Sequence, residues 1–184
     1  MDKYRRRLFK YSFGAGLLYN FPFINNIIAQ NNCSTQTPTQ PAGPFFKINS
    51  PKISNFVKKD SDIKKIKLMG KIMNSRCIPI HNAIIDFWHC DSKGIYDNEN
   101  FLFRGHQETS KSGKYFLETL FPGIYPGRTP HIHVKITTSK GVKLVTQLYF
   151  INHPLNINDP LFDERLIMSN VGNNFSYDFF LKEI

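Results

Sequence analysis

Residues 131–137, His-Ile-His-Val-Lys-Ile-Thr, alternate between polar and aliphatic side chains. This alternation is typical of a β-strand. Because residues i and i+2 of a strand point to the same face, His131 and His133 lie side by side, and their imidazoles can meet one metal ion. A His-x-His pair alone is weak evidence for a metal, so the residues that accompany it decide its role.

The rest of the chain shows further short apolar or alternating runs with strand character. They span 66–73, 83–89, 114–119, 144–150 and 177–181. Turn signals at 91–94, 111–113, 121–123 and 139–141 separate them. No convincing 3.6-residue period lies between them, and 17 Phe and 8 Tyr suit pleated surfaces. We therefore predict an all-β fold, a single β-sandwich domain over 45–184 with long loops.

The 184 residues suffice for one domain with one core, and 41% hydrophobic with 21% charged residues is a globular composition. Residues 30–44 are rich in Asn, Gln, Thr and Pro. Such a composition disfavours helix and predicts an extended N-terminal arm or linker in front of the domain.

Residues 1–29 have the order of an export signal. Three arginines, Arg5 to Arg7, precede two bulky apolar residues and Lys10, and an uncharged stretch then runs to the small residue Ala29. This pattern predicts a twin-arginine-type signal and therefore a periplasmic or extracellular location. Asn and Pro interrupt the uncharged stretch, so we expect no stable membrane span. A basic amphipathic anchor is the alternative interpretation.

The net charge of +10 is concentrated at the N-terminus. Five of the 24 basic residues and one of the 14 acidic residues lie in 1–29, which leaves +6 for the remainder. The lysine-rich stretch 58–67 has no interleaved aromatic residues, so it indicates a solvated face, and we expect no nucleic-acid partner.

Three cysteines are present, at 33, 77 and 90. Outside the cytoplasm two of them can form a disulfide. We expect Cys77 to pair with Cys90 and Cys33 to be the odd cysteine, although spacing alone does not establish the pairing. No CxxC or Cys/His spacing of a zinc site occurs.

Two tyrosines accompany the histidine pair. Tyr125 lies in the Pro- and Gly-rich stretch before His131, and Tyr96 follows the turn at 91–94. A zinc site usually adds a third His, a carboxylate or Cys, and a non-haem Fe(II) oxygenase adds one carboxylate. A phenol has a pKa of about 10, so it binds a metal as phenolate only when a hard, strongly polarising cation keeps it deprotonated. Ferric iron fits this donor set best.

Seven segments extend the pattern beyond the four candidate ligands. They are 37–46 (TPTQPAGPFF), 77–80 (CIPI), 83–91 (AIIDFWHCD), 94–96 (GIY), 103–109 (FRGHQET), 122–133 and 146–150 (TQLYF). In this order they resemble the intradiol ring-cleavage dioxygenases, the family of catechol 1,2-dioxygenase and protocatechuate 3,4-dioxygenase, and especially its short exported members.

The resemblance implies a site and a reaction. It implies that Tyr96, Tyr125, His131 and His133 bind Fe(III), and that Tyr125 leaves the metal as substrate enters. It further implies that Arg128 lies beside the substrate ring and that Gln147 lines the pocket. The implied reaction uses O2 to open a catechol-type ring between its two hydroxyl-bearing carbons, which yields a muconate-type diacid. The particular catechol and the oligomeric state stay open.

Two other functions remain possible at this point. A transthyretin-like sandwich would bind a partner without catalysis, and its histidines would be structural. An exported zinc hydrolase would use His131 and His133 but lacks a third conventional ligand and a nucleophile. We also expect Trp88 to serve packing rather than substrate contact, and His89 and His106 to orient groups around the site.

Overall fold

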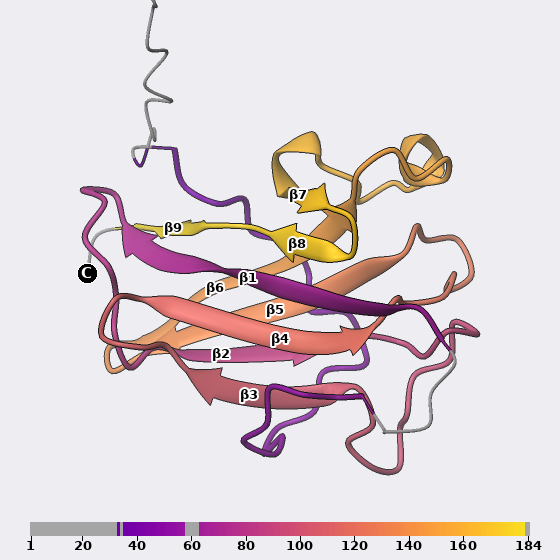
Figure 1. The fold of residues 1–184 in the computed structure, drawn as a ribbon, viewed down its shortest axis with the longest axis horizontal. Coiled ribbons are helices and arrows are strands. Elements are labelled where there is room, and N and C mark those ends of the chain that lie inside the picture. The colour runs from indigo at the N-terminus through magenta and orange to yellow at the C-terminus, as the bar shows by residue number, and fades with distance from the viewer. Residues whose placement is uncertain (1–32, 34, 58–62, 183–184) are drawn as a thin grey trace, which may run out of the picture. The chain divides into compact units, whose positions relative to one another are not determined.

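Nine strands and two short 3₁₀ helices form the regular structure of the computed structural model, which describes residues 33, 35–57 and 63–182 (Figure 1). The expected export segment, 1–29, lies outside the described residues. The elements are β1 (Lys65–Asn74), β2 (Ile84–Trp88), β3 (Arg104–Glu108), β4 (Lys114–Leu120), β5 (His131–Thr138), β6 (Gly141–Phe150), η1 (Asn156–Asn158), η2 (Glu164–Leu166), β7 (Ile167–Val171), β8 (Asn174–Ser176) and β9 (Phe179–Leu181).

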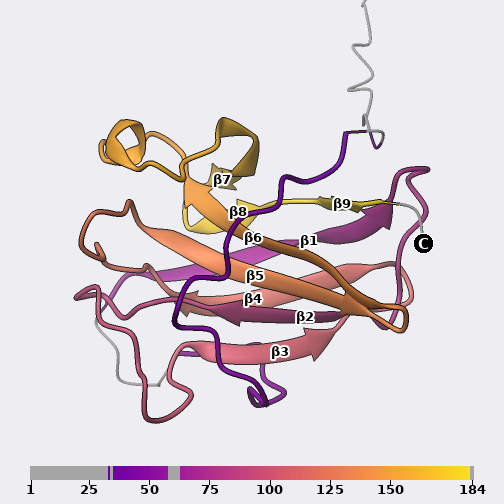
Figure 2. The ribbon, with the colours of Figure 1, turned by 180° about the vertical axis from the view of Figure 1, so that it is seen from behind.

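The strands form two layers that are joined through β7. One layer has the order β3-β2-β5-β6-β7, and the other continues as β8-β1-β4, with β9 paired to β1. In Figures 1 and 2, β1 and β4 lie on one side of the molecule and β5 and β6 on the other. The predicted all-β sandwich is therefore confirmed. Among the described residues, no helix is long and apolar enough to cross a membrane.

The core lies between the two layers and is built from alternate residues of each strand. On β5, Ile132, Val134 and Ile136 are each 0% exposed. Aliphatic and aromatic side chains from β1, β2, β4 and β6 to β9 belong to the same cluster, among them Leu68, Phe87, Leu117 and Leu148. This burial of apolar surface is the main stabilising contribution to the fold.

Most strand predictions are confirmed to within a few residues, and three strands are additional. β3, β7 and β8 were not predicted, and β9 is the end of the predicted run 177–181. β3 has the polar sequence Arg-Gly-His-Gln-Glu, which shows no apolar alternation. It is a strand because it pairs antiparallel with β2 over its whole length.

The N-terminal arm crosses the outer face of the β5/β6 layer, the face turned away from the core (Figure 2). The amide of Thr37 donates to the carbonyl of Phe180 at 3.0 Å, and that of Gln40 donates to Val145 at 2.8 Å. These bonds hold the arm to β9 at one point and to β6 at the next. The arm therefore becomes a cover over the face on which His131 and His133 lie.

The expected cysteine pairing is wrong. Cys33, at the start of the arm, forms the disulfide with Cys77, and Cys90 is free and buried. Cys90 points into the cluster around Trp88 and Tyr96, where its thiol donates to the carbonyl of Gly123 at 3.5 Å. Cys33 was expected to be the odd cysteine because it precedes the domain, but the path of the arm brings it to Cys77.

Candidate metal centre

Three donor atoms converge on the outer face of β5. His131 Nε2 and His133 Nε2 are 3.1 Å apart, and the Tyr96 hydroxyl lies 3.3 Å from the first and 3.1 Å from the second. The three residues are 3–6% exposed. Ligand atoms that share one first-row cation at about 2 Å are separated by roughly 3 Å. The spacing of these atoms therefore fits a single cation.

The imidazole of His131 is oriented by the chain just before it. Its Nδ1 lies 2.7 Å from the carbonyl of Thr129. A carbonyl only accepts, so Nδ1 carries the proton and Nε2 presents its lone pair toward His133 and Tyr96. A hydrogen bond of this kind on the far nitrogen is the usual support for a metal-binding histidine.

The imidazole of His133 is held by ring packing. It stacks on Trp88 with centroids 4.8 Å apart and planes 3° from parallel. Its Nδ1 has no hydrogen-bond partner among the described residues. Trp88 is 2% exposed, as expected for a packing residue, but it packs against the candidate site and not between the sheets.

Burial shifts the titration of all three groups. Desolvation lowers the pKa of His131 to about 4 and that of His133 well below its usual range, so both imidazoles are neutral at pH 7. Burial also raises the pKa of Tyr96, so its phenol stays protonated unless a cation stabilises the phenolate. Two neutral imidazoles and a buried phenol are a donor set that a hard cation would satisfy.

Two glycines bring the loops of Tyr96 and Tyr125 together. A Cβ on Gly94, where φ is +81°, would lie 2.0 Å from the carbonyl oxygen of Ile124. A Cβ on Gly123 would lie 2.5 Å from the amide nitrogen of Gly94. Only glycine allows this approach, and the Gly123 amide then donates to the carbonyl of Asp91 at 2.8 Å. The turn glycines found in the sequence thus position both tyrosines.

Tyr125 joins the cluster through its ring. Its centroid lies 5.7 Å from that of Tyr96 and 5.4 Å from that of Phe45, both in edge-on contacts. Phe45, the residue directly after the arm, also stacks on Tyr96 at 4.1 Å. Tyr125 is only half-buried, and no hydrogen bond of its hydroxyl is among the described contacts. The structure brings the donor atoms of three predicted ligands together. The ring of the fourth, Tyr125, lies beside them.

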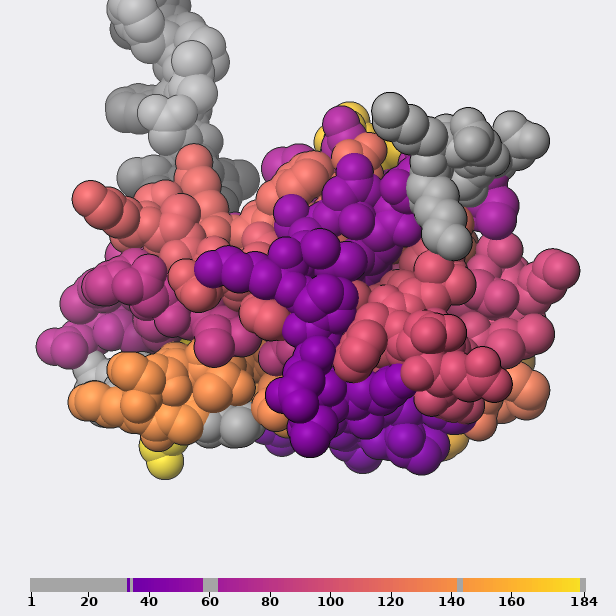
Figure 3. All heavy atoms as spheres, turned by 90° about the horizontal axis from the view of Figure 1, so that it is seen from below, coloured from indigo at the N-terminus to yellow at the C-terminus, as the bar shows by residue number. Residues whose placement is uncertain are grey.

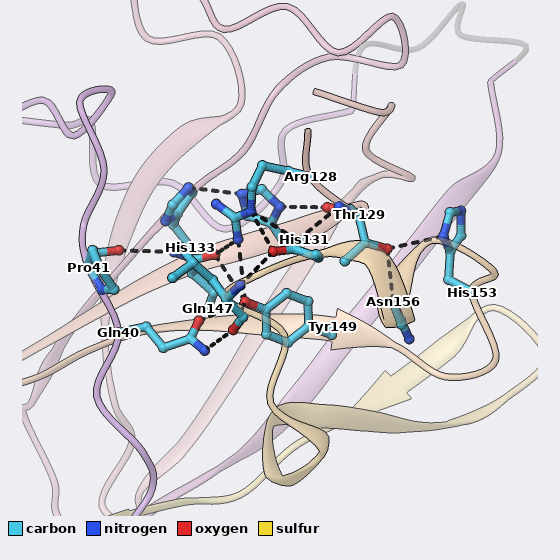
Figure 4. Close-up of polar contacts among 12 residues, drawn as sticks. Gln40, Pro41, Arg128, Thr129, His131, His133, Gln147, Tyr149, His153 and Asn156 are labelled. Carbon is cyan, nitrogen blue, oxygen red and sulfur yellow. Dashed lines mark hydrogen bonds and ion pairs between the residues drawn. The ribbon is translucent and has the colours of Figure 1, made fainter. Parts of the chain in front are cut away.

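Arg128 and Gln147 lie next to the histidines and contact each other (Figure 4). Arg128 Nη2 donates to Gln147 Oε1 at 2.5 Å, and Gln147 is the cross-strand partner of His133. Arg128 Nε lies 2.9 Å from both carboxylate oxygens of Asp159. The two residues predicted to line the pocket therefore form one hydrogen-bonded unit beside the donor cluster.

The arm closes over this unit. Gln147 Nε2 donates to the carbonyl of Pro41 at 3.0 Å, and the Tyr149 hydroxyl lies 2.8 Å from both Gln40 Oε1 and the carbonyl of Leu161. In the space-filling view from below, the arm and the residues after it form a purple band over the surface (Figure 3). The site thus has a polar cover that is part of the same chain.

The contacts do not meet the expectations for His89 and His106. His89 lies between the sheets, where Nε2 meets the Thr119 hydroxyl at 2.7 Å. His106 contacts the Ser50 hydroxyl at 3.1 Å. Neither touches the donor cluster among the described contacts. Sequence reasoning missed Asp159, Tyr149 and Phe45, of which Tyr149 and Phe45 stood inside the matched segments and Asp159 beyond them.

Comparisons with known proteins agree with this arrangement. A family model described as "Dioxygenase" matches residues 41–174. The chain belongs to the intradiol dioxygenase family. The match begins inside the predicted region and extends past Phe150 to include Asp159.

Two curated relatives and one solved structure illustrate the likeness. The protocatechuate 3,4-dioxygenase beta chain of Burkholderia cepacia is 31% identical over 117 residues, which are 54% of this chain and 50% of the relative. Hydroxyquinol 1,2-dioxygenase of Corynebacterium glutamicum is 27% identical over 162 residues, which are 73% of this chain and 54% of the relative. The chain thus spans about half the length of these relatives.

The solved structure is the dioxygenase domain of a dioxygenase carbohydrate-binding protein fusion from the cellulolytic bacterium Streptomyces sp. SirexAA-E. It is 40% identical, with a TM-score of 0.77, and the match covers 80% of this chain and 99% of that domain. The match therefore takes in nearly the whole of that solved domain.

Proposed function

We propose that this protein is an intradiol ring-cleavage dioxygenase that opens a catechol-type aromatic with O2 at a mononuclear Fe(III) centre. The observation that carries the proposal is the convergence of Tyr96 Oη, His131 Nε2 and His133 Nε2 within 3.3 Å of one another. Family membership and the neighbouring ring of Tyr125 support it.

The four candidate ligands divide into a fixed and a movable part. Tyr96, His131 and His133 are buried and held by packing or hydrogen bonds, whereas Tyr125 is half-buried on a loop with glycine on both sides. Gly127 has φ +77° with open space around it. Tyr125 would therefore be the phenolate that catechol replaces, and its Oη would take a proton from a catechol hydroxyl.

Ferric iron, when bound, would supply a Lewis acid that holds the catecholate by both oxygens and makes the ring reactive toward O2. The chain supplies the surroundings. The guanidinium of Arg128 would offer hydrogen-bond donors to the buried phenolate and catecholate oxygens. Gln147, fixed by Arg128 and by Pro41, forms a polar wall, and Phe45 with Trp88 keeps water from the buried ligands.

We also propose that the protein is exported and acts outside the cytoplasm. The pattern of residues 1–29 supports this location. The Cys33–Cys77 disulfide adds support, since disulfides persist mainly in oxidising compartments. The substrate would then be a catechol or larger phenolic present outside the cell.

The two alternatives fit the site less well. A purely binding sandwich gives no reason to bury two imidazole nitrogens and a phenol oxygen against one another. A zinc hydrolase would use a carboxylate, a third histidine or a thiolate, whereas the third donor atom here is the Tyr96 hydroxyl. Among the described residues, no group of three His, Cys, Asp or Glu side chains could hold a metal ion.

Colour and oxygen uptake test the proposal. Protein loaded with one ferric ion should be wine-red from tyrosinate-to-iron charge transfer, and it should consume O2 with at least one of catechol, protocatechuate, hydroxyquinol or a substituted catechol. Tyr125→Phe should lose part of the charge-transfer absorption and most of the activity. Tyr177→Phe is the matched control, since its hydroxyl bonds the Arg165 carbonyl at 2.8 Å, away from the donor cluster.

A protein that stays colourless after loading with ferric iron would refute the iron site. Red protein that takes up no O2 with any of these catechols would refute ring cleavage but keep the metal. Equal activity of Tyr125→Phe and Tyr177→Phe would show that Tyr125 is not a ligand.

A further inference from the structure

The buried carboxylate of Asp159 pairs with Arg128, and the proposed reaction assigns it no role. The Asp159 side chain is 0% exposed, and that of Arg128 is 15% exposed. Both carboxylate oxygens of Asp159 lie 2.9 Å from Arg128 Nε. This charge-assisted contact through Nε, together with the Nη2 bond to Gln147, holds the guanidinium at two points.

Asp159 is itself held rigidly. Oδ2 accepts from the amide of Thr129 at 2.9 Å, and Oδ1 accepts from that of Leu161 at 2.9 Å. The Thr129 carbonyl in turn accepts from His131 Nδ1 at 2.7 Å. One carboxylate therefore connects the guanidinium beside the site with the backbone that orients a candidate ligand.

The pair also decides the local charge. Arg128 and Asp159 border a hollow of about 160 Å³ that Ile124 and Leu155 also line. The arginine contributes one positive charge and the aspartate cancels it. The other buried cation near the cluster, Arg104, donates to the carbonyls of Phe45 and Asp97. Each of its three nitrogens thus donates to a backbone carbonyl of the chain.

We propose that Asp159 is a positioning residue that also sets substrate specificity, because it holds Arg128 in place and neutralises it. A catechol brings its negative charge through the two ring oxygens, which the metal would take. A substrate with an additional carboxylate on the ring needs a second, uncompensated cation. The site therefore favours catechols with neutral or apolar substituents over carboxylated ones. This inference rests on the proposed function.

Removing the charge of Asp159 should reverse this preference. In Asp159→Asn and in the smaller Asp159→Ser, Arg128 carries an uncompensated charge that attracts a ring carboxylate. The ratio of kcat/KM for protocatechuate to that for catechol should rise roughly tenfold. The kcat for catechol should fall at the same time, because the guanidinium is no longer held. A loss of folded protein alone would lower the apparent kcat/KM for both substrates by the same factor and leave the ratio unchanged.

The chain offers a matched control. Asp163 forms a similar pair with Arg165, at 2.6 Å, but this arginine side chain is 65% exposed. Asp163→Asn removes the same charge from an arginine away from the site, and it should leave the ratio unaltered. If the same rise occurs there, it reports net charge and overturns the assignment to Asp159.

A second readout needs no turnover. Metal-free protein is titrated calorimetrically with benzoate and with phenol, which differ in charge at one position. The Asp159 variants should bind benzoate more tightly relative to phenol than the wild type does. Two variants of different size guard against one that fails to fold.

The possible failures are distinguishable. An unchanged or lower ratio in the folded Asp159 variants, by kinetics or by binding, overturns the role of Asp159. Efficient turnover of protocatechuate over catechol by the wild type also overturns it. Absence of any ring cleavage in iron-loaded wild type refutes the proposed function, while the benzoate-to-phenol comparison still reports on Asp159.

Discussion

The two faces of β5 are equally buried but are closed by different means. Ile132, Val134 and Ile136 face the second sheet and are 0% exposed, whereas His131 and His133 face the arm and are 3% exposed. The inner face belongs to a hydrophobic core cluster to which β1, β2, β4 and β6 to β9 also contribute. The outer face meets the arm, two loops and a polar network that includes Arg128 and Gln147.

The difference shows how one strand can serve stability and chemistry together. A sheet-on-sheet core excludes water by packing alone, so any polar group there needs a partner. A face covered by an arm and loops also excludes water. Its buried side chains can nevertheless keep donor atoms, such as His131 Nε2 and His133 Nε2, available for a ligand. Substitutions on each face should therefore have separable effects.

His133→Ala should have the largest effect. It should abolish metal binding and activity at the outer face and leave the core on the inner face intact. The variant removes one of three converging donor atoms, and even loss of a supporting partner of a ligand costs about 10–100-fold in metal affinity or activity. We expect the red colour to be lost and oxygen uptake with a turned-over catechol to drop by more than about 100-fold. His81→Ala, an exposed histidine, is the control. Retained colour with retained activity would contradict the ligand assignment.

Ile132→Ala should show the reverse pattern. Truncation of a fully buried isoleucine leaves a cavity between the sheets, and the free energy of unfolding should fall by about 2–5 kcal/mol. Urea denaturation of metal-free protein measures it. Val171→Ala, at a side chain 84% exposed, should change it by less than about 0.5 kcal/mol. Iron-loaded Ile132→Ala should keep the colour per folded molecule, and a loss of colour without unfolding would show that the faces are coupled.

The pH dependence of stability tests whether burial between the two sheets keeps His89 uncharged. Burial lowers the pKa of His89, between the sheets, to about 4 from the ordinary value of 6.5. Between these values the unfolded chain binds a proton that the folded chain does not, so stability falls as the pH decreases from 6.5 to 4. His89→Gln should remove about 1.4 kcal/mol per pH unit from this slope, or about 3 kcal/mol in total.

Urea denaturation of metal-free protein at pH 7 and at pH 4.5 provides the measurement. The other buried histidines contribute to the slope in both proteins, so the difference between wild type and variant is the relevant quantity. Identical slopes for wild type and variant would mean that the pKa of His89 in the folded protein is close to the ordinary value of 6.5.

Cys33→Ser should have the smallest effect, on the cover of the outer face. The disulfide spans 44 residues of sequence. Its loss should cost about 2 kcal/mol, the low end of the usual range, because backbone hydrogen bonds still hold the arm. Denaturant unfolding with and without a reductant measures this cost, and the variant should show no further change on reduction.

Peptide mapping of the oxidised protein checks the same pairing directly. It should find Cys33 joined to Cys77 and one free thiol, Cys90, which reacts only after unfolding because it is buried. A peptide that joins Cys77 to Cys90 would contradict the structure.

Local patterns were sufficient for most of the frame. Alternation along 131–137 predicted β5 and placed two histidines on one face, because side-chain direction in a strand depends only on sequence parity. Glycines at 94 and 123 indicated turns, and both prove necessary for the approach of the tyrosine loops. β3 escaped prediction because its strand character comes from pairing with β2 and not from its own polar residues.

The sequence by itself determined the all-β class, the principal strands and the candidate ligands, since each depends on a short-range pattern or on the order of motifs. The tertiary structure decided the rest: that Cys33 and not Cys90 pairs with Cys77, that the arm covers the site, and that Asp159 holds Arg128 across 31 residues. These contacts join segments distant in sequence. No local periodicity encodes them, and they exist only when two sheets, an arm and two loops have packed together.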